Sequence, residues 1–309
     1  MATVAWNPKA RMDEEPILPD ETGLTYRLLA ASACTYAIDK AGGVEKCPQF
    51  PFVGFKDDPA TFQAGPDDIN ACLVGDMEDG VVLAFRGTIP FDIHDIKSLI
   101  DWINDFDAVP VKIDGLPGRV HDGFHKSVAS LWDKFLPAIQ ERMSESKPLY
   151  ITGHSKGAGM APIAAALLRK RLGINASVIQ LFAPPRPGTE DFSNYFDESF
   201  PGTVRYEHQD DLGPHLPVHF GLMDALSKIP KIGPFFRGLK AWDYSAVGQL
   251  RFIDWNGKIV GELSGLEKKR FERLALLIVE LRFRKIGEDH ALLGGYRAAV
   301  RRRKGCSVA

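Results

Sequence analysis

The sequence predicts an α/β fold in which helices cover both faces of a mostly parallel central sheet. Three short apolar runs, Leu149–Thr152, Ser177–Phe182 and Thr203–Tyr206, are typical of buried strands. Between the first two runs, Lys156–Leu172 is rich in Ala and Leu and is expected to be a helix. Strands that alternate with helices indicate a parallel sheet. The 309 residues are 45% apolar and 25% charged, as in an ordinary globular protein.

The N-terminal part of the chain is expected to contain a lead-in, a helix and a hairpin. Residues 1–20 are rich in proline and acidic residues, which favours an extended lead-in. Thr22–Lys40 has apolar residues at helical spacing and is followed by glycines that would end a helix. Asn70–Gly75 and Val81–Phe85 are apolar runs on either side of a charged turn. This arrangement predicts a β-hairpin.

The C-terminal part is expected to contain a second hairpin and a long helix. In the segment Gln249–Val260, Asn256-Gly257 separates two apolar runs and marks a tight hairpin turn. The apolar spacing from Leu266 to Arg284 predicts one continuous helix.

Composition and motifs exclude several functional classes. The 38 Lys and Arg residues nearly balance 40 Asp and Glu residues, giving a net charge of −2, which argues against nucleic-acid binding. Motifs typical of zinc, calcium or nucleotide sites are missing, so we expect no metal or other cofactor. The sequence has no internal repeat and no low-complexity linker. We therefore expect residues 1–309 to form one domain, with 220–283 as an extra segment of less regular sequence.

The N-terminal sequence also suggests where the protein is located. It has no apolar stretch of the length of a secretory leader, so we expect no signal peptide. The most apolar run, Leu274–Val279, is too short to span a bilayer. The sequence therefore predicts a cytoplasmic protein without a transmembrane segment, in at most peripheral contact with a membrane.

The strongest chemical signal is the stretch Gly153-His154-Ser155-Lys156-Gly157, which matches G-x-S-x-G. It lies between a predicted strand and a predicted helix, which is the context that this motif needs. There the serine occupies a strained turn, flanked by glycines because a Cβ would collide with neighbouring elements. Its hydroxyl stands at a helix N-terminus, which favours developing negative charge. We therefore expect Ser155 to be a nucleophile.

A serine nucleophile needs a base and an acid that orients this base. In doubly wound hydrolases the acid and then the histidine follow the serine in the chain. Asp210 and Asp211 follow a predicted strand, where an acid would point into the site. Among the downstream histidines, His290 has the best order and separation, and His215 is the alternative. Spacing alone does not choose between the two aspartates.

The oxyanion of such a reaction needs backbone N–H donors. The residue after the nucleophile, Lys156, supplies one amide in this fold. Phe85-Arg-Gly-Thr88 follows a predicted strand and is the second candidate, in which Thr88 can add its hydroxyl.

Several motifs together resemble the class 3 lipases, the fungal-type triacylglycerol lipases and their bacterial and plant relatives. The resemblance runs from about Asn70 to Tyr296, and seven motifs occur in the family's order. They are Phe85–Thr88, Asp101–Asp105, Val120–Phe124, Gly153–Gly157, Phe182–Gly188, Arg205–Pro217 and Asp289–Tyr296.

The resemblance implies a role for each chemical residue. Ser155 is implied as the nucleophile and His290 as the base, and the oxyanion donors are Thr88 and the amide of Lys156. The register of the motif that contains His208 and Pro214-His215 selects Asp211 over Asp210 as the acid. The family's position 156 is usually apolar, so Lys156 would place a cation beside the nucleophile.

The family also has a short lid helix after its FRGT motif, and residues 89–100 would occupy that place here. Phe91 and Ile93 are among the apolar residues compatible with one face of this helix. A lid uses such a face to cover an acyl pocket in water and to open on a lipid surface. We expect Phe91, Ile93 and His154 to contact the substrate.

These observations together predict an α/β-hydrolase that acts as a serine-dependent carboxylic ester hydrolase. The expected partner is a lipid or ester substrate, such as an acylglycerol, with transient contact to a lipid surface. A phospholipase or an acyltransferase on the same triad is one alternative. A catalytically inactive lipid-binding protein is another. The sequence contains no signal for an oligomeric state.

Overall fold

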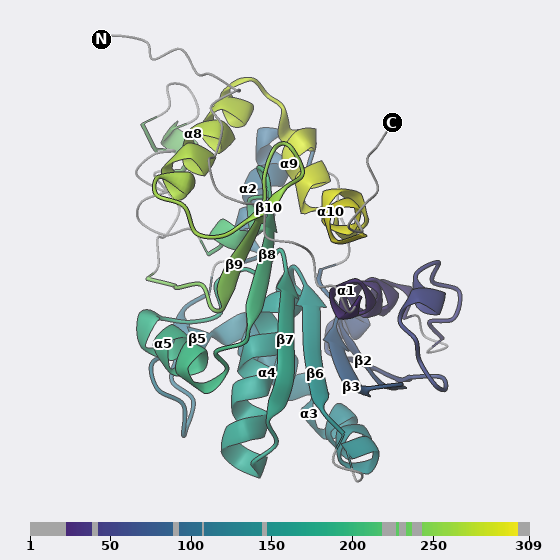
Figure 1. Ribbon diagram of the computed structural model, residues 1–309. Coiled ribbons are helices and arrows are strands. Elements are labelled where there is room, and N and C mark those ends of the chain that lie inside the picture. Colours follow the sequence, from purple (N-terminus) through teal and green to yellow (C-terminus); the bar gives the residue numbers. More distant parts are fainter. Residues whose placement is uncertain are drawn as a thin grey trace.

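The computed structural model describes residues 23–38, 43–88, 93–106, 108–143, 147–217, 227–228, 233–236 and 243–301. Within these ranges an eight-stranded sheet runs in the order β1-β2-β3-β6-β7-β8-β9-β10 (Figure 1). Its strands are β1 Ala60–Ala64, β2 Asn70–Met77, β3 Gly80–Phe85, β6 Leu149–His154, β7 Ala176–Phe182, β8 Val204–His208, β9 Gln249–Ile253 and β10 Ile259–Val260. The five strands from β3 to β9 are mutually parallel, and β1, β2 and β10 are antiparallel additions at the two edges. Two short strands, β4 Pro110–Val111 and β5 Val120–His121, pair separately.

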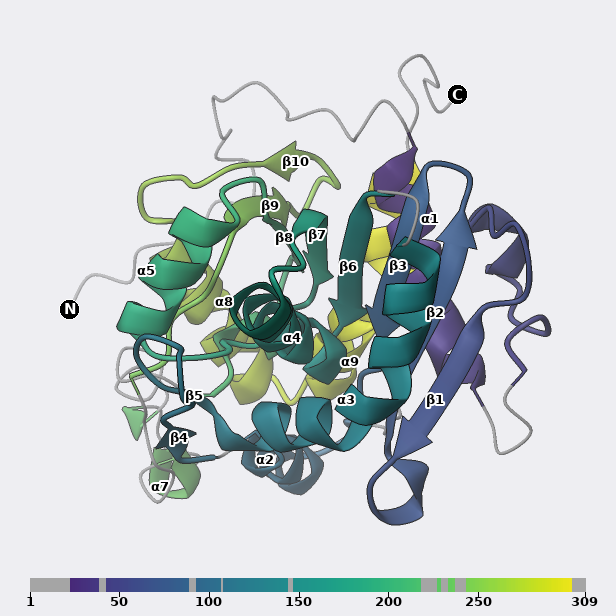
Figure 2. The same ribbon diagram turned by 90° about the horizontal axis from the view of Figure 1, so that it is seen from below.

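Helices cover both faces of this sheet, as α3 and α4 lie on one face and α1 on the other (Figure 2). The helices are α1 Leu24–Cys34, α2 Ile96–Asn104, α3 Asp122–Arg142, α4 Lys156–Leu172, α5 Glu190–Ser199, α7 Gly233–Phe236, α8 Leu266–Val279, α9 Phe283–His290 and α10 Arg297–Arg301. This arrangement confirms the predicted fold class.

The alternation of side chains in the hairpin strands explains the two layers of core. In β3, Leu83 and Phe85 belong to the cluster that contains α3 and α4, whereas Val82 and Ala84 belong to the cluster around α1. All four side chains are fully buried. Because successive residues of a strand point to opposite faces, a run that is apolar throughout can bury both faces.

Most of the predicted elements are present. The helix from Lys156 to Leu172 has the predicted bounds, and the two hairpins form as β2–β3 and β9–β10. The helix predicted over Thr22–Lys40 is shorter, because α1 gives way to a 3₁₀ turn at Thr35–Ala37.

The single helix predicted from Leu266 to Arg284 is wrong, because the chain breaks after α8. Leu281 has a φ of 58°, and its amide donates to the carbonyl of Ile278. The next amide, that of Arg282, donates to Leu277. These two bonds around a left-handed residue form a Schellman helix end. The sequence did not signal it because leucine, not glycine, occupies the left-handed position.

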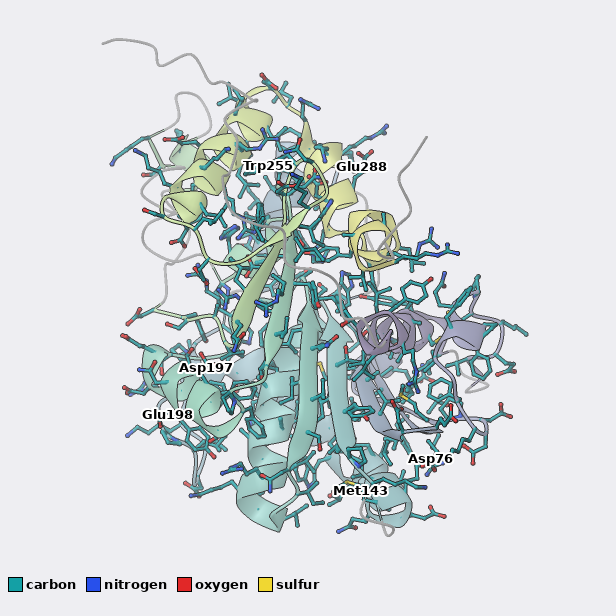
Figure 3. The ribbon with its side chains drawn as sticks, in the orientation of Figure 1. Asp76, Met143, Asp197, Glu198, Trp255 and Glu288 are labelled. Carbon is teal, nitrogen blue, oxygen red and sulfur yellow. The ribbon has the colours of Figure 1, made fainter. Side chains whose placement is uncertain are left out.

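The break redirects the chain so that α9 ends at His290. Helices α2, α8 and α9 lie together near the end of the sheet at which β6, β7 and β8 finish (Figure 1). Figure 3 shows Trp255 and Glu288 at this end, and Asp76 and Met143 at the opposite end. The carboxyl ends of parallel strands are where doubly wound sheets carry their binding sites.

Some expectations fall on residues outside the described ranges. These are the lead-in 1–20, residues 89–92 of the expected lid, which include Phe91, and parts of the segment 220–283. The described parts of the segment 220–283 include β9, β10 and α8.

Candidate active site

Ser155 lies in a sharp turn between β6 and α4. Its backbone has φ 55° and ψ −129°, a conformation that costs an L-residue on the order of 1–3 kcal/mol. Its amide donates to the carbonyl of Phe182 on the neighbouring strand, at 3.0 Å, and this bond helps to hold the turn. The turn places Ser155 directly before the first amide of α4.

The glycines of the motif are required by close backbone packing. A Cβ on Gly157 would lie 2.2 Å from the carbonyl oxygen of Phe85 at the end of β3. A Cβ on Gly153 would lie 2.5 Å from the carbonyl carbon and oxygen of Gly157. Both distances are far below van der Waals contact, so any side chain at these positions would move the turn away from β3.

The structure brings Ser155, His290 and Asp211 into one hydrogen-bonded chain. The Oγ of Ser155 lies 2.8 Å from Nε2 of His290, and Nδ1 of His290 lies 2.8 Å from Oδ1 of Asp211. These side chains come from β6–α4, the end of α9 and the loop after β8, so 135 residues separate the serine from the histidine. A nucleophile that is hydrogen-bonded to a base, which is in turn hydrogen-bonded to an orienting acid, is the arrangement found in serine hydrolases.

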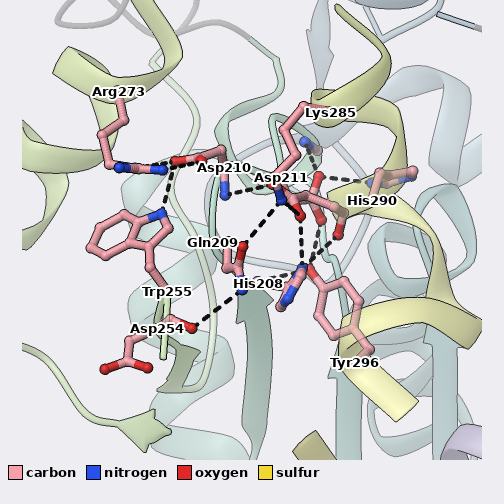
Figure 4. Close-up of polar contacts among 12 residues, drawn as sticks. His208, Gln209, Asp210, Asp211, Asp254, Trp255, Arg273, Lys285, His290 and Tyr296 are labelled. Atoms are coloured by element: carbon pink, nitrogen blue, oxygen red, sulfur yellow. Dashed lines mark hydrogen bonds and ion pairs between the residues drawn. The ribbon is translucent and has the colours of Figure 1, made fainter. Parts of the chain in front are cut away.

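Asp211 is buried and is held as an anion by three donors. The Tyr296 hydroxyl donates to Oδ2 at 2.6 Å, and the amide of Gly213 donates to Oδ1 at 2.8 Å (Figure 4 shows Asp211, His290 and Tyr296). Burial acts to raise the pKa of Asp211. The interaction with His290 and the hydrogen bonds from Tyr296 and Gly213 together outweigh burial. They hold the pKa of Asp211 below its usual value. An ionised Asp211 accepts a hydrogen bond from the Nδ1–H of His290, which leaves Nε2 of His290 free to accept the serine proton.

The alternative acid, the alternative base and the neighbouring His208 are engaged elsewhere. Both carboxylate oxygens of Asp210 accept from Arg273 at 2.7 Å, and the indole N–H of Trp255 donates to the same carboxylate (Figure 4). Nδ1 of His208 lies 3.0 Å from the carbonyl of Asp289. The ring of His215 packs edge-on against Phe271, and His215 is not part of the cavity wall that contains Ser155.

The two expected oxyanion donors flank the serine. Thr88 lines the same cavity as Ser155 and His290, and Lys156 is the first residue of α4. The first amides of a helix have no partner within the helix, so the Lys156 amide is available to a ligand. Gly87 must be a glycine, because a Cβ there would lie 2.7 Å from the His154 carbonyl oxygen.

The side chain of Lys156 does not place its charge beside the nucleophile. Its ammonium donates to Oδ1 of Asn70, at 2.8 Å, and the residue is not part of the cavity wall. Burial, reinforced by the positive charge of Arg86, lowers the pKa of Lys156. The expected cation in the substrate pocket is therefore absent at this position.

Sequence reasoning missed Tyr36, which is held against the site through His154. The hydroxyl of Tyr36 lies 2.7 Å from Nδ1 of His154, and Nε2 of His154 lies 2.9 Å from the carbonyl oxygen of His290. A carbonyl only accepts, so Nε2 must carry the proton and Nδ1 accepts from Tyr36. Burial lowers the pKa of His154 to about 3, which keeps this tautomer neutral. The two hydrogen bonds, from Tyr36 to His154 and from His154 to the carbonyl of His290, hold the backbone of His290 in place.

A cavity of about 450 Å³ opens over Ser155. Most of its wall is apolar, and Ile93 and His154, two of the three expected substrate-contacting residues, are part of it. The wall consists of Ala33, Tyr36, Ile38, Arg86, Thr88, Ile93, Trp102, His154, Ser155, Gly287, His290, Ala291, Leu292 and Leu293. An apolar cavity with a few polar groups at one point suits an apolar ligand with one reactive polar group.

Helix α2 closes one side of this cavity. Its N-cap residue is Asp95, whose carboxylate accepts from the amide of Ser98 in a capping box. Trp102 of α2 is 3% exposed, and its ring packs edge-on against His290 with the centroids 4.8 Å apart.

A second acidic group, Asp289, lies beside the triad. Burial raises its pKa to about 6, although Lys285 pairs with it and acts in the opposite direction. A carboxyl group with a raised pKa contributes stability that is fully present below its unfolded pKa, near 4, and is lost as the pH rises through 6.

Replacing Asp289 by asparagine should therefore change how stability depends on pH. Between pH 4 and 7.5, we expect the free energy of unfolding of the wild type to fall relative to Asp289→Asn by about 2–3 kcal/mol. Urea denaturation across this range measures the difference. Glu288→Gln, which alters an exposed neighbouring carboxyl, is the control. Parallel pH profiles for the wild type and Asp289→Asn would contradict the expectation.

Within the described ranges, no three His, Cys, Asp or Glu side chains are grouped as a metal site would require. No helix in the same ranges combines the length and apolar composition needed to cross a bilayer.

Comparisons with known proteins agree with this geometry. The family model "Lipase (class 3)" matches residues 82–221. A secreted mono- and diacylglycerol lipase 3 of Gibberella zeae is 27% identical over 148 residues, 45% of each chain. A lipase of Rhizopus niveus is 28% identical over 172 residues, 53% of this chain and 42% of the relative. The matches thus span less than half of the length of these relatives.

The fold is also that of a solved lipase. The triacylglyceride lipase of Rhizomucor miehei superimposes with a TM-score of 0.62 at 21% identity, covering 82% of this chain and 91% of that chain. At this identity the likeness concerns the fold.

The comparisons correct one expectation. The predicted cytoplasmic location is wrong, because the relatives include fungal lipases, one of them named as secreted, and these point to an extracellular location. The composition of the first residues was an insufficient basis for that prediction. Over residues 82–221, the chain is similar to the class 3 lipase family.

Proposed function

We propose that this protein is a serine-dependent carboxylic ester hydrolase that acts on acylglycerols or other lipid esters. The observation that carries the proposal is the bond between Ser155 Oγ and His290 Nε2, at 2.8 Å, at the base of a largely apolar cavity. The names of the relatives support the substrate class, since one is named for mono- and diacylglycerols.

In the proposed reaction, His290 takes the Ser155 proton as the hydroxyl oxygen attacks the ester carbonyl. The negative charge that forms on the carbonyl oxygen is stabilised by the amides of Thr88 and Lys156. His290 then gives its proton to the leaving alcohol, and the acyl group stays on Ser155. Water, deprotonated by the same histidine, attacks the acyl carbonyl and breaks its bond to Ser155. His290 returns the proton to Ser155 Oγ as the acid leaves. Asp211 keeps the imidazole in the correct tautomer throughout.

We further propose that α2 acts as the lid. The buried side chains of α2, Leu99, Trp102 and Ile103, give it an apolar face. A lipid surface could take up this face when the helix moves away from His290. The proposed lid reaches Asn104, beyond the residue 100 expected from the sequence, because the helix and its tryptophan continue past that residue.

Hydrolysis of p-nitrophenyl esters from C2 to C16, with and without detergent micelles, tests the proposed function. Ser155-dependent activity that peaks at C8 or longer and rises with micelles is the expected result. A peak at C2 to C4 without a gain from micelles would mean an esterase for short soluble esters. No hydrolysis at any length would contradict the proposal and favour the acyltransferase or the inactive lipid-binding protein.

The Tyr36–His154 pair should act on turnover and not on substrate binding. In Tyr36→Phe, Nδ1 of His154 loses its donor and the His290 backbone is held less firmly. We expect kcat for a soluble ester to fall roughly 10-fold, equivalent to one hydrogen bond, with little change in KM. Steady-state kinetics measure both constants.

Tyr150→Phe is the control, because it removes a partly buried hydroxyl that donates to the Asp79 carbonyl, and Tyr150 is not part of the cavity wall. It should lower stability to a similar degree and leave kcat unchanged. A wild-type kcat in Tyr36→Phe would show that the pair does not position the base.

A further inference from the structure

A second cavity, of about 470 Å³, lies outside the site described above and shares no wall residue with the cavity over Ser155. It is formed between β8, the start of α8 and the loop that follows β7. The three elements contribute one arginine each: Arg205, Arg270 and Arg186. Their side chains are 14%, 5% and 11% exposed, so three guanidinium groups are buried around one space.

The buried negative charge around this cavity is smaller than the positive charge. Glu207 is the buried carboxylate, and it accepts from both Arg205 and Arg270. The other acidic partners are exposed: Glu262 binds Arg205 at 2.7 Å and is 73% exposed, and Glu267 binds Arg186 at 3.3 Å and is 59% exposed. Pairs with exposed partners are screened by water and contribute little. The interior of the cavity is therefore cationic.

Several guanidinium donors in this cavity have no acceptor among the described residues. These are Nε and Nη2 of Arg270 and Nε of Arg186, and all three atoms are buried. A buried donor that stays unpaired costs on the order of 1–3 kcal/mol, and more when it is charged. Burial also lowers the pKa of Arg186 to about 10, which reflects the cost of keeping this charge away from water.

We propose that this cavity binds a small oxyanion, a phosphate or a carboxylate group, between Arg270 and Arg186. The planar fork of a guanidinium matches two oxygens of such a group, and the unpaired N–H groups would receive acceptors. The added negative charge would balance the buried arginines that Glu207 alone does not neutralise. A volume of this size accommodates a small organic anion.

Thermal unfolding in potassium phosphate and in potassium acetate, each against potassium chloride at equal ionic strength, tests the proposal. With a dissociation constant near 1 mM, we expect 50 mM of the anion to raise the Tm of the wild type by about 3–4 °C over chloride. A shift with phosphate alone identifies a tetrahedral ligand, and a shift with both anions identifies a general oxyanion site. No shift with either anion overturns the proposal.

Two variants at Arg270 locate the binding. Arg270→Lys keeps a cation beside Glu207 but lacks the fork, and isothermal titration should show phosphate binding weakened at least about 10-fold. Arg270→Met should abolish binding, and Arg284→Met, which removes an exposed arginine on α9, should leave it unchanged. If Arg270→Met does not fold, the lysine variant still decides. Wild-type affinity in Arg270→Lys would show that phosphate binds elsewhere, and would overturn the proposal.

Discussion

Ser155→Ala should lower kcat/KM for a p-nitrophenyl ester by a factor on the order of 10⁶, the scale found when a member of another serine triad is removed. The alanine side chain has no oxygen to attack the carbonyl or to carry the acyl group. The remaining rate would come from the oxyanion donors and from substrate binding alone. Steady-state assays of purified wild type and variant, at substrate concentrations well below KM, measure the ratio.

The control for this prediction is Ser264→Ala, which removes an exposed hydroxyl outside the cavity and should keep wild-type activity. Far-UV circular dichroism and Tm should be similar for both variants and the wild type. A fluorophosphonate probe should label the wild type and not Ser155→Ala. If Ser155→Ala retained more than a tenth of the wild-type rate, another nucleophile would have to be sought.

The nucleophile turn was predictable from sequence because its causes are local. Gly153 and Gly157 lie two residues from Ser155, and the strand and helix on either side have clear apolar patterns. The conformation of Ser155 then follows from the need to pass between β6 and α4 with its backbone against β3. The glycines of the motif are therefore needed for the same close backbone packing that the structure shows.

The residues that pack around the nucleophile turn were harder to predict, because tertiary packing determines which side chains meet there. Tyr36 is 118 residues from His154 and meets it only because α1 and its 3₁₀ extension cover the sheet beside β6. Leu281 has the left-handed conformation that lets α9 turn back with His290 at its end. A glycine would have indicated this conformation in the sequence, but the residue is a leucine. The direction of the Lys156 side chain depends on Asn70 at the start of β2.

The choice between Asp210 and Asp211 also depends on tertiary packing, although the two residues are adjacent in the sequence. Spacing after the predicted strand suited both, and only the resemblance to the family separated them. In the structure the two carboxylates point to different partners: Asp210 to Arg273 and Trp255, and Asp211 to His290 and Tyr296 (Figure 4). These partners come from α8, the loop after β9, the end of α9 and the turn that follows it, all more than 40 residues further along the chain.

Asp211→Asn should reduce kcat by a factor on the order of 10⁴, as the equivalent change does in another serine triad. An asparagine can present an N–H to Nδ1 of His290, which favours the tautomer with the proton on Nε2. In that tautomer His290 cannot accept the Ser155 proton. The imidazolium that forms during the reaction would also lose its stabilising negative charge. The loss should persist across the pH range, because no group in the variant restores that charge.

Asp210→Asn is the matched comparison, because it makes the same chemical change one residue earlier. It breaks the two-point ion pair with Arg273, so it should lower the Tm, but it leaves the His290 contact intact and should keep most of kcat. Measuring kcat and Tm for both variants separates a loss of catalysis from a loss of stability. A larger loss of kcat in Asp210→Asn than in Asp211→Asn would assign the acid to Asp210. It would also mean that the hydrogen bond between Asp211 and His290 is not the one that orients the base.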